Sequence, residues 1–265
     1  MSEQVIRLIA FLSIFCTMAV FELWSPRLER NEMAGALKSK RWFTNLSMVV
    51  ISSVSLRILF PAAAVGTAMW AQNANFGLFN MVSAPVWPVG VFCFFVLDFA
   101  VWLEHWASHK FAILWRIHRM HHADQGFDLT TALRFHPLEI VLSMFWKALI
   151  IVLLGVPVYA VLIFEIVLNG MAMFNHANAK LPLKLDAILR KVVVTPDMHR
   201  VHHSVINKET DSNYGFNFSF WDRIFSTYID QPSAGHDNMK IGLTEYDGAK
   251  TSNLIWALML PFRKV

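Results

Sequence analysis

The sequence is short of charged residues. Only 16% of its 265 residues are charged, whereas a soluble domain usually carries about 25%. Hydrophobic residues make up 55%, and they include 22 Phe and 10 Trp, aromatics that collect at membrane interfaces and on lipid-facing helices. This composition indicates a chain whose solvent is partly lipid. The net charge of +4 is mild and no Lys/Arg run forms a stripe, so the sequence does not predict a nucleic-acid partner.

Cysteine is also scarce. Cys16 and Cys93 both lie inside apolar runs, and they allow neither a disulfide framework nor a zinc ribbon. The sequence also lacks the Gly-x-Gly-x-x-Gly fingerprint of flavin and nicotinamide sites and the His-Glu-x-x-His motif of zinc hydrolases. A bound metal would therefore need other ligands, and 11 histidines are available.

Long apolar runs predict membrane-spanning helices, because about 20 apolar residues cross a bilayer. The last run is long enough for two helices, and Gly155 and Pro157 divide it into a hairpin. We expect an all-α protein with about 4–5 spanning helices and a helical cytosolic cap. The four runs are residues 5–24, 42–70, 86–103 and 138–176.

The distribution of Lys and Arg predicts the orientation in the membrane, because cytoplasmic loops are enriched in both. The predicted loop 25–41 is basic, whereas no Lys or Arg lies between Arg57 and Lys110. Loop 25–41 is therefore expected in the cytoplasm and loop 71–85 on the opposite side. The basic residues of loop 25–41 are Arg27, Arg30, Lys38, Lys40 and Arg41.

The same reasoning predicts two regions. Residues 1–104 are expected to anchor the chain in the membrane, and residues 105–265 to form the catalytic region. The second region includes the hairpin 138–176 and a cytosolic lobe, 177–265, with eleven Lys/Arg. The site would then lie on the cytoplasmic face.

Eight histidines fall into three tight motifs. Positions i, i+3 and i+4 of a helix share one face, so each motif offers its imidazoles to a single point. Neutral imidazole binds Fe, Zn, Cu and Ni, and eight such ligands suit two ions within ~4 Å of each other. A single pair would mean little, but three motifs on one membrane face predict a dinuclear metal site. The motifs are His105-Trp-Ala-Ser-His109, His118-Arg-Met-His121-His122 and His199-Arg-Val-His202-His203.

These motifs resemble those of the fatty acid hydroxylase/sterol desaturase superfamily. Shorter segments that match less specifically are residues 130–137, 175–178, 213–215 and 221–223. In all, the resemblance covers the chain from about Asp98 to Tyr228. It implies a helical membrane domain, a site with two iron ions held by the eight histidines, and O2 as the oxidant. It also favours His176 as a ninth ligand, although His176 could instead be a residue of a polar helix end.

Other polar residues near the motifs are secondary candidates. His136 could be a metal ligand or pack against Arg134, whereas His236 lies in a Gly/Asp-rich segment and is expected to be solvated. Ligating histidines usually donate their second ring N–H to a carboxylate or a carbonyl. The candidates for such a role, or for binding metal directly, are Asp98, Asp197 and Asn178.

The resulting hypothesis is a membrane-bound, non-haem di-iron oxygenase that hydroxylates or desaturates a lipid from the bilayer. A sterol, fatty acyl chain, alkyl ether lipid or carotenoid would fit. Since no electron-delivery domain is visible, a separate haem or iron–sulfur carrier is implied. The alternatives are a zinc hydrolase, a metal transporter with ligands near the bilayer midplane, and a haem electron carrier. The oligomeric state is left open.

Overall fold

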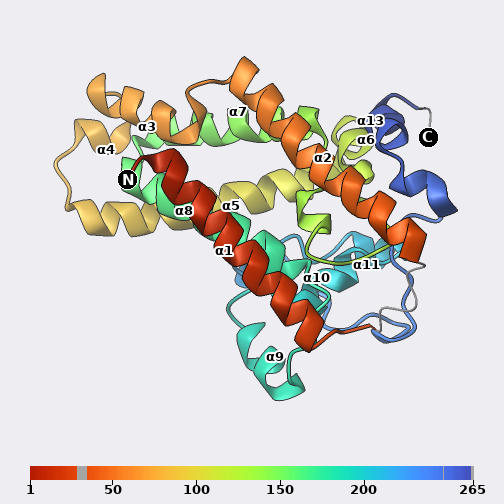
Figure 1. Ribbon diagram of the computed structural model, residues 1–265. Helices are drawn as coiled ribbons and strands as arrows, with labels where there is room; N and C mark the ends of the chain where they lie inside the picture. The colour runs from red at the N-terminus through yellow and green to blue at the C-terminus, as the bar shows by residue number, and fades with distance from the viewer. Residues whose placement is uncertain (29–34, 247, 264–265) are drawn as a thin grey trace.

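The computed structural model describes residues 1–28, 35–246 and 248–263. Within these ranges the chain is helical and forms isolated β-bridges but no strand (Figure 1). Five segments are long and apolar enough to cross a membrane, as the hydropathy of the sequence predicts. They are Glu3–Trp24, Lys38–Met81, Val86–Lys110, Pro137–Leu154 and Val158–Asn175.

The elements follow the apolar runs closely. The longer helices are α1 (Glu3–Trp24), α2 (Gly35–Leu59), α3 (Ala63–Asn73), α5 (Val86–Lys110), α6 (Ala112–His122), α7 (Pro137–Leu154) and α8 (Val158–Asn175). Short helices are α4 (Leu78–Met81), α9 (Leu183–Leu189), α10 (Pro196–His202), α11 (Asn207–Thr210), α12 (Phe220–Ile224) and α13 (Leu254–Met259). Single 3-10 turns are η2 (Thr131–Leu133), η3 (Gly248–Ser252) and η4 (Leu260–Phe262).

Proline and glycine set two of the helix ends. Pro61 separates α2 from α3, because its ring cannot continue the α2 hydrogen-bond ladder. Gly155 ends α7 in the left-handed conformation, with a φ of 65°, and Pro157 precedes the first residue of α8. The hairpin predicted from these two residues is therefore confirmed.

Helix α5 is longer than its apolar run. The run ends near Trp102, but the helix continues to Lys110 and thereby carries His105 and His109. The polar residues that end the run are compatible with a helix, so hydropathy alone places this boundary too early.

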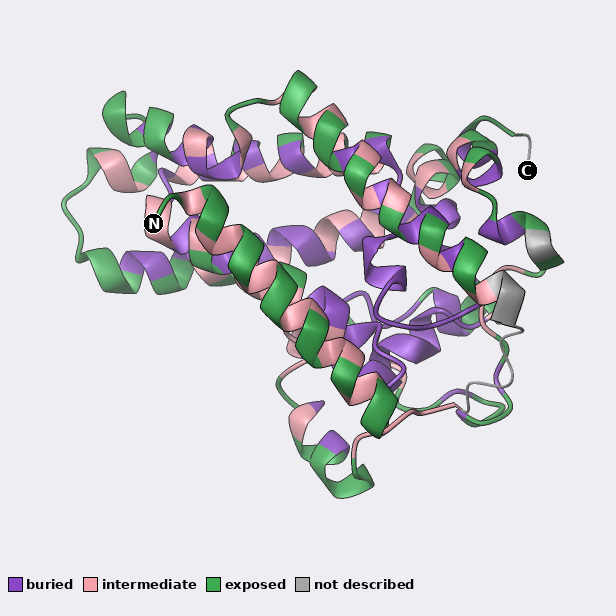
Figure 2. Ribbon diagram, viewed as in Figure 1, coloured by how far each residue is buried: buried purple, intermediate pink, exposed green. Residues whose placement is uncertain are grey.

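The largest apolar core of the described residues lies between α3, α5, α7 and α8. Its buried residues include Ala68, Leu97, Ile151 and Phe164. The opposite faces expose large apolar side chains, and α1 has no buried residue at all (Figure 2). A helix that exposes apolar residues along its length is suited to contact with lipid rather than water.

The predicted basic loop 25–41 requires a correction. Helix α2 begins at Gly35, so Lys38, Lys40 and Arg41 lie on a helix, whereas Arg30 is outside the described residues. The Arg41 guanidinium is buried and forms ion pairs with Asp124, at 3.4 Å, and with Asp128. Arg41 thus connects α2 to the segment after α6 instead of facing solvent.

Most of the short helices lie at one end of the long ones, whereas α4 lies at the other (Figure 1). In Figure 1, α4 lies at one end of the helical bundle, and α10 and α11 lie toward the other, near α6. Figure 2 shows that this second end is largely buried although much of it is not regular helix. The histidine motifs are located there.

Candidate metal centre

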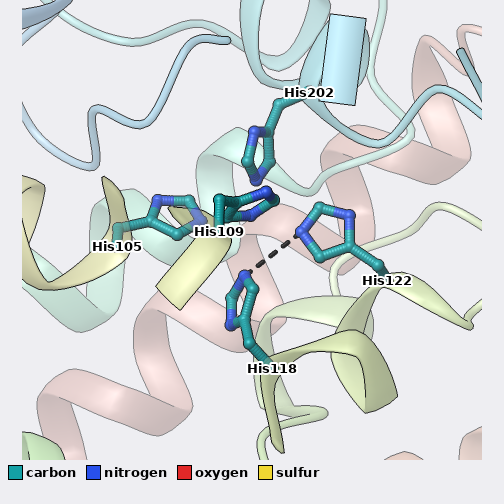
Figure 3. Close-up of side chains that lie close together, drawn as sticks. All are labelled: His105, His109, His118, His122 and His202. Atoms are coloured by element: carbon teal, nitrogen blue, oxygen red, sulfur yellow. Dashed lines mark hydrogen bonds between the residues drawn. The ribbon is translucent and has the colours of Figure 1, made fainter. Parts of the chain in front are cut away.

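All nine histidines proposed as ligands come together in two groups. In each group, one ligand atom per residue lies within 4.8 Å of the others. Figure 3 shows the five-histidine group with its rings directed toward one another. The five-histidine group is His105, His109, His118, His122 and His202, and the four-histidine group is His121, His176, His199 and His203.

Helix geometry explains how neighbouring residues reach different groups. In α6, His118 and His122 are four residues apart and share one face, while His121 points into the other group. Likewise, His202 at the end of α10 joins the five-histidine group, whereas His199 joins the other. Each His-x-x-His-His motif therefore supplies both groups, and the expectation that each motif offers all its imidazoles to a single point is wrong. The groups are contiguous, because the rings of His122 and His203 stack with their centroids 4.5 Å apart.

Backbone carbonyls orient several of these rings. A carbonyl oxygen can only accept, so the ring Nδ1–H of the histidine donates and the Nε2 lone pair is free to bind metal. His105 donates to Tyr214 O, His176 to Ala172 O and His202 to Ser212 O, each at 2.7 Å. His121 makes a longer contact of 3.3 Å to Arg134 O.

Glu139 holds His118 through a 2.6 Å contact between its carboxylate and Nδ1. No sequence pattern marks Glu139, and this kind of role was expected of Asp98, Asp197 and Asn178 instead. Asp98 instead accepts from Trp221 Nε1 at 2.8 Å, and Asp197 pairs with Arg27 at 3.1 Å. Glu139 lies in the first turn of α7, and only the packing of α7 on α6 brings it to His118.

The remaining predicted candidates lie outside both groups. The Asn178 amide oxygen accepts from Leu28 N at 3.0 Å. His136 caps α7: its Nδ1 accepts from Leu138 N, and its Nε2–H donates to Leu258 O, both at 3.2 Å. The expectation of a solvated His236 is wrong, since this residue is only 7% exposed and its Nδ1 lies 3.8 Å from Asp197.

The nitrogen atoms fit metal ions. Within the part of the chain that the structure describes, several buried ring nitrogens have no hydrogen-bond partner, among them Nε2 of His105, His109 and His202. Other Nε2 atoms face each other at 3.0–3.2 Å, in the pairs His118–His122, His121–His176 and His176–His199. Two nitrogen atoms that bind the same metal ion, each at about 2.1 Å and with their bonds at right angles, would lie about 3 Å apart. Nitrogens this close leave room for an ion between them but not for a haem ring.

Burial also keeps these imidazoles in the form that binds metal. Desolvation lowers the pKa of His176 to about 4 and that of His202 to about 3. Desolvation likewise lowers the pKa values of His121, His122, His199 and His203. At neutral pH these rings are uncharged, as a metal ligand requires.

A family profile for fatty acid hydroxylases matches residues 90–227, just over half of the chain. The chain belongs to the fatty acid hydroxylase family. The matched segment runs from α5 to just past α12 and contains all nine histidines of the two groups. Together with the five apolar helices, this membership indicates that the chain is an integral membrane protein.

Several characterised proteins are similar in sequence. An ornithine lipid hydroxylase of Rhizobium tropici is 25% identical over 268 residues, covering 97% of this chain and 75% of that protein. The alkylglycerol monooxygenase of Homo sapiens is 30% identical over 171 residues, covering 64% of this chain and 36% of its own. The alkylglycerol monooxygenase of Danio rerio is 30% identical to the chain, and the match covers 32% of that monooxygenase. The chain thus spans about a third of these monooxygenases. No solved structure matches the chain.

Asp222 positions one part of the histidine site. Its buried carboxylate accepts from Trp102 Nε1 at 3.0 Å, from Thr227 Oγ1 at 2.7 Å, and from the amides of Tyr214 and Gly215 at 2.8 and 2.9 Å. The two amides use different carboxylate oxygens, and the Tyr214 carbonyl is the one that orients His105.

We expect Asp222→Asn to weaken both folding and metal binding. One amide N–H would face the new NH2 group, and an unmet buried donor costs about 1–3 kcal/mol. Thermal unfolding and metal titration of the purified protein would measure the two losses. Asp237→Asn is the matched control, because Asp237 forms only an exposed ion pair with Arg27. Equal behaviour of the two variants would contradict the positioning role.

The lowered pKa values predict that the stability of the metal-free protein depends on pH. Folded pKa values of about 4 and about 3 lie below the ordinary value of 6.5, so the unfolded chain binds protons that the folded chain does not. The free energy of unfolding therefore has its full value above pH 6.5. It falls as the pH drops from 6.5 toward the folded-state pKa values, by about 1.4 kcal/mol per pH unit for each such histidine. Thermal unfolding at about pH 7.5 and about pH 5 tests this expectation. The metal-loaded protein should lose at least as much, because bound metal keeps these imidazoles unprotonated in the folded state while the unfolded chain still binds the protons. Equal stability of the metal-free protein at the two pH values would contradict the expectation.

Proposed function

We propose that this hydroxylase binds two iron ions, one in each histidine group, and uses O2 to hydroxylate or desaturate a membrane lipid. The observation that carries the proposal is the pair of contiguous, buried, all-histidine groups. Imidazole ligands suit iron, and family membership supports an oxygenase over a transporter, a zinc hydrolase or an electron carrier.

The bound metal would supply the step that side chains cannot perform, which is the activation of O2 for attack on an unactivated C–H bond. In a hydroxylation, one oxygen atom enters the C–H bond and the other leaves as water, with two electrons and two protons consumed. The chain's own residues set the geometry. Glu139 and the carbonyls of Tyr214 and Ser212 fix the ring orientations, so the Nε2 atoms are preorganised.

The substrate is proposed to be a membrane lipid, which could be a sterol, a fatty acyl chain, an alkyl ether lipid or a carotenoid. The relatives are named for ornithine lipids and alkylglycerols, which supports a lipid with a polar end. Membranes containing the iron-loaded protein or His202→Ala should be given isotopically labelled O2 and an electron donor. We expect labelled or desaturated lipids only with the unaltered protein. Identical lipid profiles in both membranes would refute the proposal.

Two further parts of the proposal concern the surroundings of the site. A separate carrier, either haem or iron–sulfur, would deliver electrons to the basic lobe 177–265, where complementary charge would favour an acidic partner. Residues 1–104 would mainly anchor the chain, and residues 105–265 would form the catalytic region.

We propose that the metal centre faces the cytoplasm, because the basic residues lie on that side of the spans. Lys184 is exposed on α9, and Asn75 is exposed between α3 and α4. In a background with Cys16 and Cys93 replaced, Lys184→Cys should react with a membrane-impermeant thiol reagent only after the cytoplasmic side is opened. Asn75→Cys should react in intact cells. The reverse pattern would overturn the orientation.

A further inference from the structure

Helix α9, which follows the last span, buries polar side chains and exposes apolar ones. Its buried residue is Asp186, whose carboxylate pairs with the guanidinium of the buried Arg190. On the outer side, Leu183 is 77% exposed and Ile188 is 64% exposed, and most of the helix is coloured as exposed in Figure 2. A helix of a water-soluble domain has the reverse pattern, with its apolar face against the core. The outer side of α9 therefore suits contact with lipid.

Helix α12 shows the same inversion. Its buried residue is Asp222, whereas Ile224 is 62% exposed and the next residue, Phe225, is 46% exposed. The Phe225 ring packs on the span α5, with its centroid 4.5 Å from that of Trp102 and 5.6 Å from that of Phe99. Although α12 comes after the last span in the sequence, it therefore lies beside a membrane helix.

A hollow of about 270 Å³ lies between α5 and α12, and only apolar side chains line it. Two of these, Phe92 and Phe95 of α5, are 51% and 38% exposed. A large apolar surface on the outside of a protein marks a contact with lipid or with another protein. The exposed apolar side of α5 thus continues onto α12. The other residues that line the hollow are Val96, Phe99, Trp221, Ile224 and Phe225.

Hydrogen bonds join α12 to the end of α9. Arg223 Nη2 donates to Arg190 O at 3.1 Å, and Ser219 N donates to Val192 O at 3.0 Å. The apolar surface that begins on α5 therefore extends over α12 toward α9. The exposed apolar residues of the two helices and of the residues that follow them are here called the α9–α12 patch. They are Leu183, Leu185, Ile188, Val192, Ile224 and Phe225.

The span α1 places α9 at the level of the membrane surface. Helix α1 ends at Trp24, which is 85% exposed, and tryptophan is enriched where a span leaves the bilayer. The next residue, Ser25, donates from its hydroxyl to Lys180 O at 3.0 Å, three residues before α9 begins. Figure 1 shows α9 beside this end of α1.

Two lysines border the α9–α12 patch. Lys184 and Lys191 are exposed, and neither forms an ion pair within the described part of the chain. The neighbouring acids Asp186 and Asp230 both pair with Arg190 instead. Lysines beside an apolar surface are typical of a membrane interface, because their stems pack on lipid while the ammonium groups reach the phosphates.

We propose that the α9–α12 patch is a second membrane contact, seated in the interface of the bilayer on the side where the histidine groups lie. Lys184 and Lys191 reach the lipid phosphates and stay open to water. Because Asp222 of α12 accepts from the amides of Tyr214 and Gly215, this contact also holds the histidine site against the bilayer. The contact is independent of the proposed chemistry, so its test needs no turnover.

Quenching of fluorescent labels on the whole protein in phosphatidylcholine nanodiscs tests the proposal. In a background with Cys16 and Cys93 replaced, Ile188→Cys and Ile224→Cys are each labelled with nitrobenzoxadiazole. Nitroxide groups on lipid acyl chains quench labels in the bilayer, whereas iodide quenches labels in water. Both labels should be quenched by the nitroxide lipids and only weakly by iodide, because the patch is covered by lipid.

Two further labels calibrate the measurement. Leu12→Cys is the lipid-facing control, because Leu12 is a 50% exposed residue of the span α1. Glu245→Cys is the water-facing control, because Glu245 is an exposed acid outside the patch. Iodide quenching of the patch labels as strong as that of the Glu245→Cys label would overturn the proposal. Protection from both quenchers would also overturn it, because protein, such as a second copy of the chain, would then cover the patch.

A substitution in the patch provides an independent test. With the label moved to Leu185→Cys, Ile188→Asp should raise iodide quenching several-fold, because an unpaired carboxylate is costly in hydrocarbon and would draw α9 into water. Ile188→Leu is the matched control and should leave the quenching unchanged. Equal quenching in the two variants would overturn the proposal. Should Ile188→Asp fail to fold, the labels at positions 188 and 224 still decide.

Discussion

His202→Ala is expected to abolish lipid oxidation while leaving the protein folded in the membrane. His202 contributes to the five-histidine group, and its buried Nε2 has no hydrogen-bond partner among the described residues, so its loss would remove a proposed metal ligand. The remaining imidazoles keep some metal affinity but lose the geometry for O2 activation. The apolar core of α3, α5, α7 and α8 does not include His202, so the spans remain packed. Turnover, iron content and detergent-solubilised yield measure the three effects.

The control for this variant is His136→Asn. His136 is a buried histidine that caps α7 and belongs to neither group, and Asn preserves the capping hydrogen bond. The control should retain iron and most of its activity. His236 is unsuitable for this purpose because it is buried beside Asp197. Near-normal turnover and full iron content in His202→Ala would show that the di-iron interpretation is wrong.

His176→Ala is expected to reduce the iron content from about two ions per chain to about one, and to abolish turnover. His176 lies at the centre of the four-histidine group, since its Nε2 is 3.2 Å from His121 Nε2 and 3.0 Å from His199 Nε2. The His176→Ala variant would keep three imidazoles in this group, with a cavity where the central ring had been. Metal analysis after anaerobic loading, together with lipid oxidation, provides the test.

If His176 is only a polar residue at the end of α8 and not a ligand, the His176→Ala variant would behave differently. Activity would then persist at a reduced level, and both ions would be retained. Asn169→Ala is a useful companion variant, because Asn169 lies nearly two turns earlier on α8 and outside the histidine groups. It should keep both ions, so a loss of iron in both variants would point to general damage to α8 instead.

The sequence by itself determined the features that depend on residue type and short-range spacing. Apolar runs identified the five spans because hydropathy is a local property, and Gly155 with Pro157 predicted the hairpin through backbone conformation alone. Histidines four residues apart predicted clustered imidazoles, because helix geometry places them on a common face. The resemblance to the hydroxylases then added His176, which spacing could not have singled out.

Tertiary structure alone decided how these parts meet. The division of the nine histidines into groups of five and four depends on how α5, α6, α8 and α10 pack. The carbonyls of Tyr214 and Ser212 orient two rings, yet every residue has a carbonyl, so no sequence pattern marks them. Glu139 reaches His118, Arg41 reaches Asp124 and Asp128, and His236 becomes buried through contacts between distant segments. Hydropathy and motif spacing describe neighbours along the chain, whereas these contacts arise from the packing of one helix against another.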